Sequence, residues 1–431
     1  MKDRAAHVLV MTRLPREGRN KTRLIPALGS AGASRFHDRL ARHSIARASA
    51  YCQIAGAHLT VLLEGGGPFD GREWLGDWDL DCRGQCEGDL GRRMHTAISN
   101  AFAEGAGCAI LIGTDCPSID EEIFSEIARL LTKNDLVYVP AEDGGYCLIA
   151  MNQPYSCVFH DIPWGSGTVL ENSLRAAKIA GIKTALSDPL SDVDLPEDLL
   201  HARTSLERGA SISVVIPTFN EAETIAPLIK SLAHPQIDEI IVADGGSTDN
   251  TRAIAIRAGA KVISTDKSRA KQMNQGAMLA QSEFVCFLHA DSIPPKEFAA
   301  EILSILNTPG VAAGAFRFQL GGEKIAIAAI MELFVDLRCR IFHTPYGDQG
   351  IFVRCSIFNH LGGFPDLPIL EDLYLIKKLS KIGKIQISRA SMVTSSRRWE
   401  NGGILQTFLR HQLILLLDRF GFSPGILAKL R

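Results

Sequence analysis

Short runs of β-branched and other apolar residues alternate with stretches of helical periodicity along most of this 431-residue chain. This alternation predicts parallel strands whose connecting helices cover both faces of a sheet. The pattern starts twice, at residues 8–11 and at residues 212–216, with a polar connector that contains Gly209 between the two starts. Because a chain of this length suits two hydrophobic cores better than one, the sequence predicts two tandem α/β domains, Rossmann-like with mostly parallel sheets, at residues 1–208 and 209–431.

Five strands are predicted in each domain. They end in polar, glycine-rich loops, which is where open α/β sheets bind ligands. Two nucleotide-binding folds in tandem fit this pattern better than a single enzyme with a lid. The predicted strands are residues 8–11, 59–63, 109–112, 136–140 and 147–150 in the first domain, and 213–217, 239–243, 261–264, 284–289 and 312–318 in the second.

Charge and cysteine usage exclude several classes of protein. The formal net charge of −2 gives no general electrostatic basis for binding nucleic acid, since phosphate backbones need a basic face. The 10 cysteines include no CxxC pair, so neither zinc-site spacing nor a small disulfide scaffold fits, and reduced thiols in a cytoplasmic protein are the simplest interpretation. No secretion signal or membrane-spanning helix is predicted.

The C-terminal segment, residues 404–430, is apolar but interrupted by charges at Arg410, Asp418 and Arg419. A packed terminal helix is the simpler interpretation. The alternative is an amphipathic helix that lies on the inner face of a membrane and makes the chain a peripheral membrane protein.

The first two strand ends of the second domain carry motifs suited to a nucleotide. The first strand leads into PTFNE, whose turn places Asn220 near a helix N-terminus, where ligand-facing amides are expected. The second leads into DGGSTDNT, in which Gly245 and Gly246 allow the backbone to approach a flat base or a ribose. Asp244 can accept hydrogen bonds from either.

Asp291 lies at the tip of a later strand, in the sequence LHADS. A carboxylate in this place, beside a diphosphate, is where a divalent cation such as Mg²⁺ or Mn²⁺ would bridge enzyme and substrate. His289 suits these hard ions less well than an oxygen ligand does. We therefore expect His289 to orient Asp291 or the strand end.

The motifs of the second domain occur in an order that resembles the family 2 glycosyltransferases of the GT-A fold. The chain is most similar to the branch called rSAM/selenodomain-associated transferase 2, or arsenosugar-biosynthesis glycosyltransferase. The resemblance covers residues 211–431 and implies inverting, metal-dependent transfer of a glycosyl group from a nucleotide-sugar. It rests on PTFNE, DGGSTDNT, RAKQMNQGA, LHADS, PYGDQG, LED and RRW, which start at residues 217, 244, 269, 288, 345, 370 and 397.

The resemblance assigns roles to single residues. Asp244 would hold the nucleobase or ribose, and Asp291 the metal. Asp372 would be the general base that deprotonates the acceptor hydroxyl, since inverting transfer needs a carboxylate opposite the leaving diphosphate and paired acids raise one another's pKa. Asp348 is the rival for this catalytic position. The other substrate-binding positions are Pro217, Asn220, Glu221, Gly245, Arg269, Gln272, Asn274, Gln349, Glu371, Arg398 and Trp399.

A loop after the first strand of the first domain is rich in basic residues. It carries Arg13, Arg19, Lys21 and Arg23, and Gly18 permits the turn. These side chains would cradle a small phosphorylated substrate. The loop lacks the spacing of a Walker A motif, and a solvated basic loop is the alternative.

Acidic residues follow later strands of this domain. Asp115, together with Asp192 or Asp194, would supply two oxygen ligands to one divalent ion. Cys116 has no obvious histidine partner, so we favour packing over nucleophilic catalysis. Further predicted substrate contacts are Asp143, Gly144 and Trp164.

Residues 7–200 resemble the rSAM/selenodomain-associated transferase 1 family, or DUF2064, within the GT-A-like nucleotidyltransferase superfamily. The resemblance rests on GRNKTRL, GTDCP, PAEDGGY, IPWGS and DVDLPEDL. Because that superfamily contains both nucleotidyltransferases and glycosyltransferases, the fold does not determine the reaction. Nucleotidyltransferases of the molybdenum-cofactor type begin with a Gly-Gly motif. Residues 12–15 of this chain, Thr-Arg-Leu-Pro, stand in its place, so the resemblance does not carry over the chemistry of that type.

The sequence therefore predicts a bifunctional cytoplasmic transferase. The C-terminal domain would move a glycosyl group from a nucleotide-sugar to a small-molecule or lipid acceptor. The N-terminal domain would transfer a nucleotidyl or glycosyl group on a phosphorylated, sugar-like substrate. In the alternative, the N-terminal domain is a non-catalytic nucleotide-binding module and the C-terminal domain acts on a lipid phosphate at the membrane surface.

Overall fold

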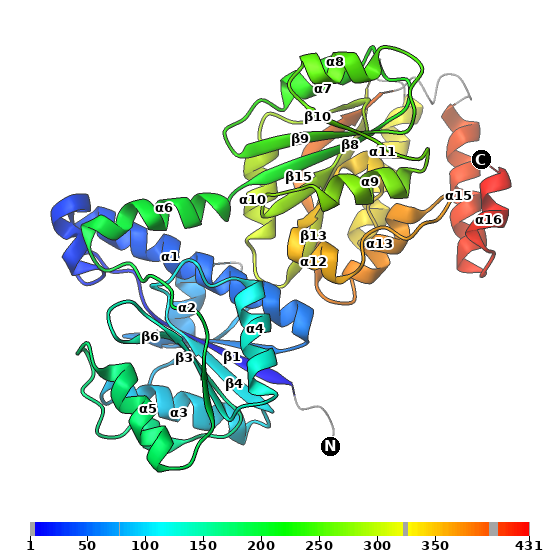
Figure 1. Ribbon diagram of the computed structural model, residues 1–431. Helices are drawn as coiled ribbons and strands as arrows, with labels where there is room; N and C mark the ends of the chain where they lie inside the picture. Colours follow the sequence, from blue (N-terminus) through cyan, green and yellow to red (C-terminus); the bar gives the residue numbers. More distant parts are fainter. Residues whose placement is uncertain (1–4, 77, 322–325, 396–403, 431) are drawn as a thin grey trace. The chain divides into compact units, whose positions relative to one another are not determined.

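The computed structural model describes two compact units of α/β architecture (Figure 1). Unit 1 is Met1–Glu207 with Thr308–Gly310, and unit 2 is Arg208–Asn307 with Val311–Arg431. Each has its own mostly parallel sheet with helices packed on it, which confirms the predicted fold class. The described residues are 5–76, 78–321, 326–395 and 404–430.

Unit 1 is built on a seven-stranded sheet in the order β3-β2-β1-β4-β6-β5-β7. Strand β6 runs antiparallel to both of its neighbours, and the other pairs are parallel. The carboxyl ends of β1 and β4 therefore meet at one edge. The strands are β1 Ala6–Arg13, β2 His58–Glu64, β3 Asp81–Gly84, β4 Cys108–Ile112, β5 Leu136–Pro140, β6 Tyr146–Met151 and β7 Thr184–Leu186.

The helices of unit 1 begin at local capping signals. Asp89 accepts the backbone N–H of Arg92 at 2.8 Å at the start of α3, and Asp120 accepts that of Ile123 at 3.0 Å at the start of α4. The helices are α1 Ile25–Ala55, α2 Pro68–Leu75, α3 Leu90–Ala103, α4 Glu121–Leu131, α5 Val169–Ile179 and α6 Leu199–Arg208.

Unit 2 has an eight-stranded sheet in the order β10-β9-β8-β11-β14-β13-β15-β12. Strand β14 is antiparallel to both neighbours, and the short β12 is antiparallel to β15. The strands are β8 Ile212–Thr218, β9 Ile237–Asp244, β10 Lys261–Ser264, β11 Phe284–Phe287, β12 Ser292–Ile293, β13 Val311–Leu320, β14 Ile351–Arg354 and β15 Lys384–Thr394.

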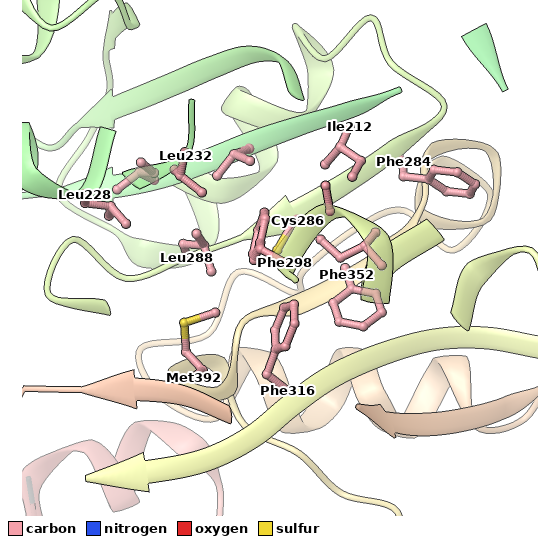
Figure 2. Close-up of a cluster of buried hydrophobic side chains, with 14 of the residues drawn as sticks. Ile212, Leu228, Leu232, Phe284, Cys286, Leu288, Phe298, Phe316, Phe352 and Met392 are labelled. Carbon is pink, nitrogen blue, oxygen red and sulfur yellow. The ribbon is translucent and has the colours of Figure 1, made fainter. Parts of the chain in front are cut away.

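The core of unit 2 is rich in aromatic side chains (Figure 2). The rings of Phe298 and Phe316 stack with centroids 5.3 Å apart, and Phe352 meets Phe316 edge-on at 5.2 Å. Such pairs add to the stabilisation from burial alone. The helices of the unit are α7 Ile225–Ser231, α8 Thr251–Arg257, α9 Arg269–Met278, α10 Phe298–Leu306, α11 Ala326–Phe342, α12 Cys355–His360, α13 Glu371–Leu379, α15 Ile404–Arg419 and α16 Pro424–Leu427.

The two sheets share one topology. When the short β12 is set aside and the strands of each unit are numbered from its own start, both orders read 3-2-1-4-6-5-7, with the sixth strand antiparallel. The ten predicted strands all occur, with ends within two residues of those predicted. Each unit therefore presents the tips of its first, second and fourth strands along one edge of the sheet.

The terminal helices α15 and α16 pack on unit 2. They bury Ile414 and Leu427, and Asp418 accepts a hydrogen bond from the Tyr374 hydroxyl of α13 at 2.9 Å. One helical stripe stays uncovered, with 47–73% of each side chain exposed, namely Leu409, Leu413, Leu416 and Phe420. No helix among the described residues has the length and apolar content to cross a membrane.

Candidate active site

The loops that follow β8 and β9 are joined by hydrogen bonds. Asn220, with a left-handed φ of +56°, donates its backbone N–H to Ser247 Oγ at 2.8 Å, and its Oδ1 accepts the backbone N–H of Thr248 at 2.8 Å. The backbone N–H of Glu221 donates to Thr251 Oγ1 at 2.8 Å. Asparagine tolerates the left-handed region, so the PTFNE and DGGSTDNT motifs form one connected edge.

Asp244 and Gln272 point into this edge. Asp244 is fully buried; its Oδ2 accepts two backbone N–H groups of the following loop at 3.1 and 2.9 Å, and its Oδ1 accepts the Thr218 hydroxyl at 3.2 Å. Gln272 donates its amide to the carbonyls of Thr218 and Ala243 at 2.8 and 2.7 Å. Both side chains hold the strand ends in place, and contact of Asp244 with a nucleoside stays a prediction.

Two further residues, which were not predicted as site residues, lie next to these loops: Phe219 follows β8 and Lys267 precedes α9. Phe219 is 38% exposed, and the Lys267 ammonium lies 3.5 Å from its ring centroid. An exposed ring backed by a cation offers a flat face for a nucleobase. Pro217 precedes it and is partly buried, and a Cβ at Gly245 would lie 3.1 Å from the Gln272 amide nitrogen, which explains the glycine.

Asp291 follows β11 and is 9% exposed. Its Oδ1 is buried, and no hydrogen-bond partner for it occurs in the part of the chain that the structure describes. A buried carboxylate oxygen without a partner is costly, and a hard divalent cation is a ligand that would satisfy it. The residues present therefore fit the predicted metal.

Gly347 lies close to both His289 and Asp372. Its backbone N–H donates to Asp372 Oδ2 at 2.7 Å. A Cβ at this position would lie 3.0 Å from His289 Nε2 and 3.3 Å from Asp372 Oδ2. The end of β11 and the start of α13 thus meet across one glycine, and His289 lies two residues from Asp291.

Asp348 is in the same cluster. The pKa of Asp348 is raised to about 6: burial is the main cause and the Asp372 carboxylate adds to it, while the guanidinium groups of Arg338 and Arg269 oppose the rise. An acid with a pKa in this range exchanges protons readily near neutral pH. Asp348 therefore remains the rival of Asp372 for the proton from the acceptor.

Other predicted site residues support the loops. Asn274 donates to the Phe364 carbonyl at 2.8 Å and accepts its N–H at 2.9 Å. Gln349 is 1% exposed and donates to the Phe316 carbonyl at 2.9 Å. Glu371 is 5% exposed, with Arg269 Nε 3.9 Å away.

Arg398 and Trp399 were predicted to clamp the leaving diphosphate and to stack on a sugar. Both lie outside the residues that the structure describes. Their roles stay predictions.

In unit 1, Lys21 lies where we predicted a metal ion. Its ammonium is 2.8 Å from Asp115 Oδ1 and 3.2 Å from Asp194 Oδ1, and its side chain is only 6% exposed. Arg23 also pairs with Asp194, at 3.1 Å. Nowhere in the described ranges do three or more His, Cys, Asp or Glu side chains form a group placed to hold a metal. The Lys21 ammonium joins the two carboxylates, and a metal ion held by Asp115 with Asp192 or Asp194 stays a prediction.

The remaining predicted residues of unit 1 surround the same edge. Burial raises the pKa of Asp192, and the nearby Asp143 carboxylate adds to the effect. A Cβ at Gly144 would lie 2.0 Å from the Gly167 carbonyl oxygen, so only glycine allows this approach. The three other predicted residues make ordinary contacts: Arg13 pairs with Glu64 at 2.9 Å, the Trp164 ring packs edge-on to Tyr146, and the Cys116 thiol donates to the Ser191 carbonyl at 3.3 Å.

Comparison with known families confirms the predicted fusion. Residues 213–355 match the model of glycosyl transferase family 2, and residues 47–166 match that of an uncharacterized protein conserved in bacteria, DUF2064. The two matches follow one another along the chain without overlap.

The curated relatives that match this chain include glycosyltransferases. The glucosyl-3-phosphoglycerate synthase of Mycolicibacterium smegmatis is 36% identical over 249 residues, which cover 50% of this chain and 80% of that protein. A PGL/p-HBAD biosynthesis glycosyltransferase of Mycobacterium bovis is 35% identical over 170 residues, which cover 35% of this chain and 62% of that protein. The synthase of Mycobacterium tuberculosis matches over only 31% of its own length, at 34% identity.

Solved structures that resemble the chain include a protein described as a nucleotide-diphospho-sugar transferase of Desulfovibrio desulfuricans G20, with 26% identity and a TM-score of 0.41 over 44% of this chain and 82% of that one. Another is glucosyl-3-phosphoglycerate synthase of M. tuberculosis in complex with Mn²⁺, UDP and glucosyl-3-phosphoglycerate, with 23% identity and a TM-score of 0.38. The match covers 50% of this chain and 84% of that one.

Family model and relatives agree on the reaction class. The synthase of M. smegmatis is matched over most of its length, and the family 2 model covers the strand tips where Asp244 and Asp291 lie. The chain therefore belongs to glycosyl transferase family 2, as a glycosyltransferase with a DUF2064 domain ahead of its family 2 domain.

Proposed function

We propose that unit 2 transfers a glycosyl group, with inversion and with the help of a divalent metal, from a nucleoside-diphosphate sugar to an acceptor hydroxyl. One observation carries this proposal: Asp291 Oδ1 is buried without a hydrogen-bond partner among the described residues, while the base candidate Asp372 is bonded to Gly347, which lies beside His289, two residues before Asp291. Open α/β sheets bind nucleotides at this edge.

The side chains divide the work of the reaction. Mg²⁺ or Mn²⁺ held by Asp291 would bind the diphosphate and offset the charge that develops on the leaving group. Asp372 accepts the proton of the acceptor hydroxyl. Its Oδ2 is fixed by the Gly347 N–H at 2.7 Å and its Oδ1 by the N–H of Leu373 at 2.7 Å, so the carboxylate is oriented before substrate binds.

The donor side is tested by thermal unfolding of the full chain with UDP-, GDP-, ADP- and dTDP-sugars, with Mn²⁺, with Mg²⁺ or with EDTA. We expect one of the nucleotides to raise Tm when a metal is present, since a ligand at 100 times its Kd stabilises the native state by about 2.7 kcal/mol. EDTA should remove the shift. If no nucleotide changes Tm in any metal, the proposed donor class is wrong.

For unit 1 we propose transfer of a nucleotidyl or glycosyl group on a phosphorylated, sugar-like substrate, which makes the chain bifunctional. The supporting observation is Lys21, a nearly buried cation between Asp115 and Asp194 at the same type of sheet edge. A phosphate of the substrate would compete for its ammonium. Arg13 and Arg23 would assist by exchanging their carboxylate partners.

This proposal predicts a selective effect of Lys21→Met. With nucleoside triphosphates and sugar phosphates as substrates, release of pyrophosphate should fall at least about 10²-fold, because a charge-assisted contact to phosphate is lost. Asp291→Asn, in the other unit, is the matched control and should release pyrophosphate at the wild-type rate. Equal release by wild type and Lys21→Met would exclude this role for Lys21, and no release by wild type would leave a non-catalytic nucleotide-binding module as the better account.

We also propose peripheral contact of residues 404–430 with a membrane at the cytoplasmic face. The support is the exposed apolar stripe of Leu409, Leu413, Leu416 and Phe420. The exposed cations Arg410 and Arg419 are adjacent in sequence to its first and last residues. An apolar stripe flanked by basic residues suits an anionic lipid surface. This contact would bring a lipid-borne acceptor within reach, and a small-molecule acceptor needs no such contact.

A further inference from the structure

Arg338, on α11, is a partly buried cation. Its guanidinium carbon lies 3.7 Å from the centroid of the Tyr346 ring, and its Nη2 makes a long contact of 3.5 Å to Gln349 Oε1. Its Nε is buried without a hydrogen-bond partner, and no ion pair of Arg338 with a carboxylate occurs in the described part of the chain.

Other arginines near Arg338 are paired in the usual way. Arg340, two residues later on the same helix, contacts Asp336 at 2.8 Å, and Arg317 of β13 contacts the same carboxylate at 3.2 Å. Asp336 is thus shared by two guanidinium groups, while Arg338 forms no ion pair with a carboxylate among the described residues. A guanidinium that is partly desolvated without a carboxylate is unfavourable, which indicates that an anion from outside the chain completes the site.

The stacking on Tyr346 prepares Arg338 for this role. A ring face against the guanidinium plane fixes its orientation and leaves the N–H edge for a carboxylate or phosphate, which it can bind through two parallel hydrogen bonds. Tyr346 is itself fixed, because its backbone N–H donates to Gln349 Oε1 at 3.1 Å.

The position of Arg338 relates it to the reacting groups. Tyr346 is adjacent to Gly347, whose N–H holds the Asp372 carboxylate at 2.7 Å. The charge of Arg338 also acts on Asp348 in the same loop, where it opposes the rise of that group's pKa. Arg338 therefore contacts the same short loop, residues 346–349, that fixes the carboxylate of Asp372.

We propose that Arg338, held by Tyr346, is the anion-binding subsite for the acceptor, so that the acceptor carries a carboxylate or phosphate group beside the hydroxyl that receives the sugar. The inference rests on the proposed function of unit 2 and adds the chemical class of its acceptor. The diphosphate of the donor is the other possible source of the same chemistry, and the experiment separates the two.

The test measures binding by calorimetry to the full chain and to the variants Arg338→Met and Arg338→Lys. The first arm titrates UDP in Mn²⁺. The second titrates 3-phosphoglycerate, glycerate and inorganic phosphate in the presence of saturating UDP and Mn²⁺. Arg340→Met is the matched control, since its side chain is 68% exposed and pairs with Asp336. Thermal unfolding of each variant confirms that the fold is kept.

We expect Arg338→Met to weaken binding of the anionic probes about 10- to 100-fold, as the loss of a charge-assisted bidentate contact implies. UDP affinity should stay within about twofold, Arg338→Lys should restore part of the affinity, and Arg340→Met should match wild type. An equal loss of UDP affinity would move Arg338 to the donor diphosphate and overturn the acceptor assignment. The acceptor assignment is also overturned if Arg338→Met binds the anionic probes as tightly as wild type does. The same holds if wild type binds UDP but none of the three anionic probes. Wild type that binds none of UDP, GDP, ADP and dTDP in Mn²⁺ would instead count against the proposed function.

Discussion

Asp372→Asn should lower the rate of glycosyl transfer by about 10³-fold, within the 10²- to 10⁴-fold that a positioned general base contributes. Asparagine keeps the size of the side chain and an oxygen for the Gly347 N–H, now 2.7 Å from Asp372 Oδ2, so the loop should keep its geometry. The variant loses the ability to accept the proton, together with the hydrogen bond from the Leu373 N–H to Oδ1. Donor affinity, measured as the Kd for the nucleotide in Mn²⁺, should therefore stay close to wild type.

The control for this variant is Asp366→Asn, which removes an exposed carboxylate ahead of α13 and should leave the rate unchanged. If Asp372→Asn transfers sugar within about tenfold of the wild-type rate, the base is not Asp372. Asp348, whose pKa is raised to about 6 by burial, would then take the role, and Asp348→Asn should show the large loss instead.

Asp291→Asn should lower transfer by a similar factor, on the order of 10³, for a different reason. Oδ1 of Asp291 is buried without a hydrogen-bond partner among the described residues, so the chain alone leaves part of this carboxylate desolvated at a cost. Removal of that charge should not lower Tm. The variant should be as stable as wild type without metal, and it should lose the extra stability that wild type gains from nucleotide and Mn²⁺ together.

Asp238→Asn is the matched control, because Asp238 is an exposed acid near the N-terminal end of β9, whereas the candidate site lies at the carboxyl ends of the strands. A metal-dependent rise in Tm that is equal in Asp291→Asn and wild type would show that the cation is held elsewhere. A large drop in Tm of the variant without metal would show that Asp291 has a structural partner.

Much of the fold follows from local sequence signals. Most of the ten predicted strands are runs of buried β-branched and apolar residues, and such runs specify a strand without knowledge of its neighbours. Strands β3, β7, β12, β14 and β15 were not predicted. β7 and β12 have only three and two residues, and β15 alternates between buried and exposed positions within a polar segment. The shared strand order and the antiparallel sixth strand were also beyond prediction, since strand pairing depends on residues far apart in sequence.

The sequence was sufficient to predict where in the fold the candidate site residues lie. Acids at strand tips must lie along the carboxyl edge, which places Asp291 correctly without any knowledge of its contacts. What each side chain bonds to was not predictable. The carboxylate of Asp244 is occupied by its own loop, Lys21 joins two carboxylates more than 90 residues away, and Arg338 meets a ring across a helix end. These contacts depend on tertiary packing, which motif spacing does not encode.

The central claim is that unit 2 is a metal-dependent transferase that uses a nucleoside-diphosphate sugar. Its most direct test is the release of nucleoside diphosphate by the full chain, followed together with the appearance of a glycosylated acceptor, in Mn²⁺ and in EDTA. The account predicts that both products form in equal amounts in Mn²⁺, that the anomeric configuration is inverted, and that EDTA stops both. Transfer that continues undiminished in EDTA, or a product of retained configuration, would contradict it.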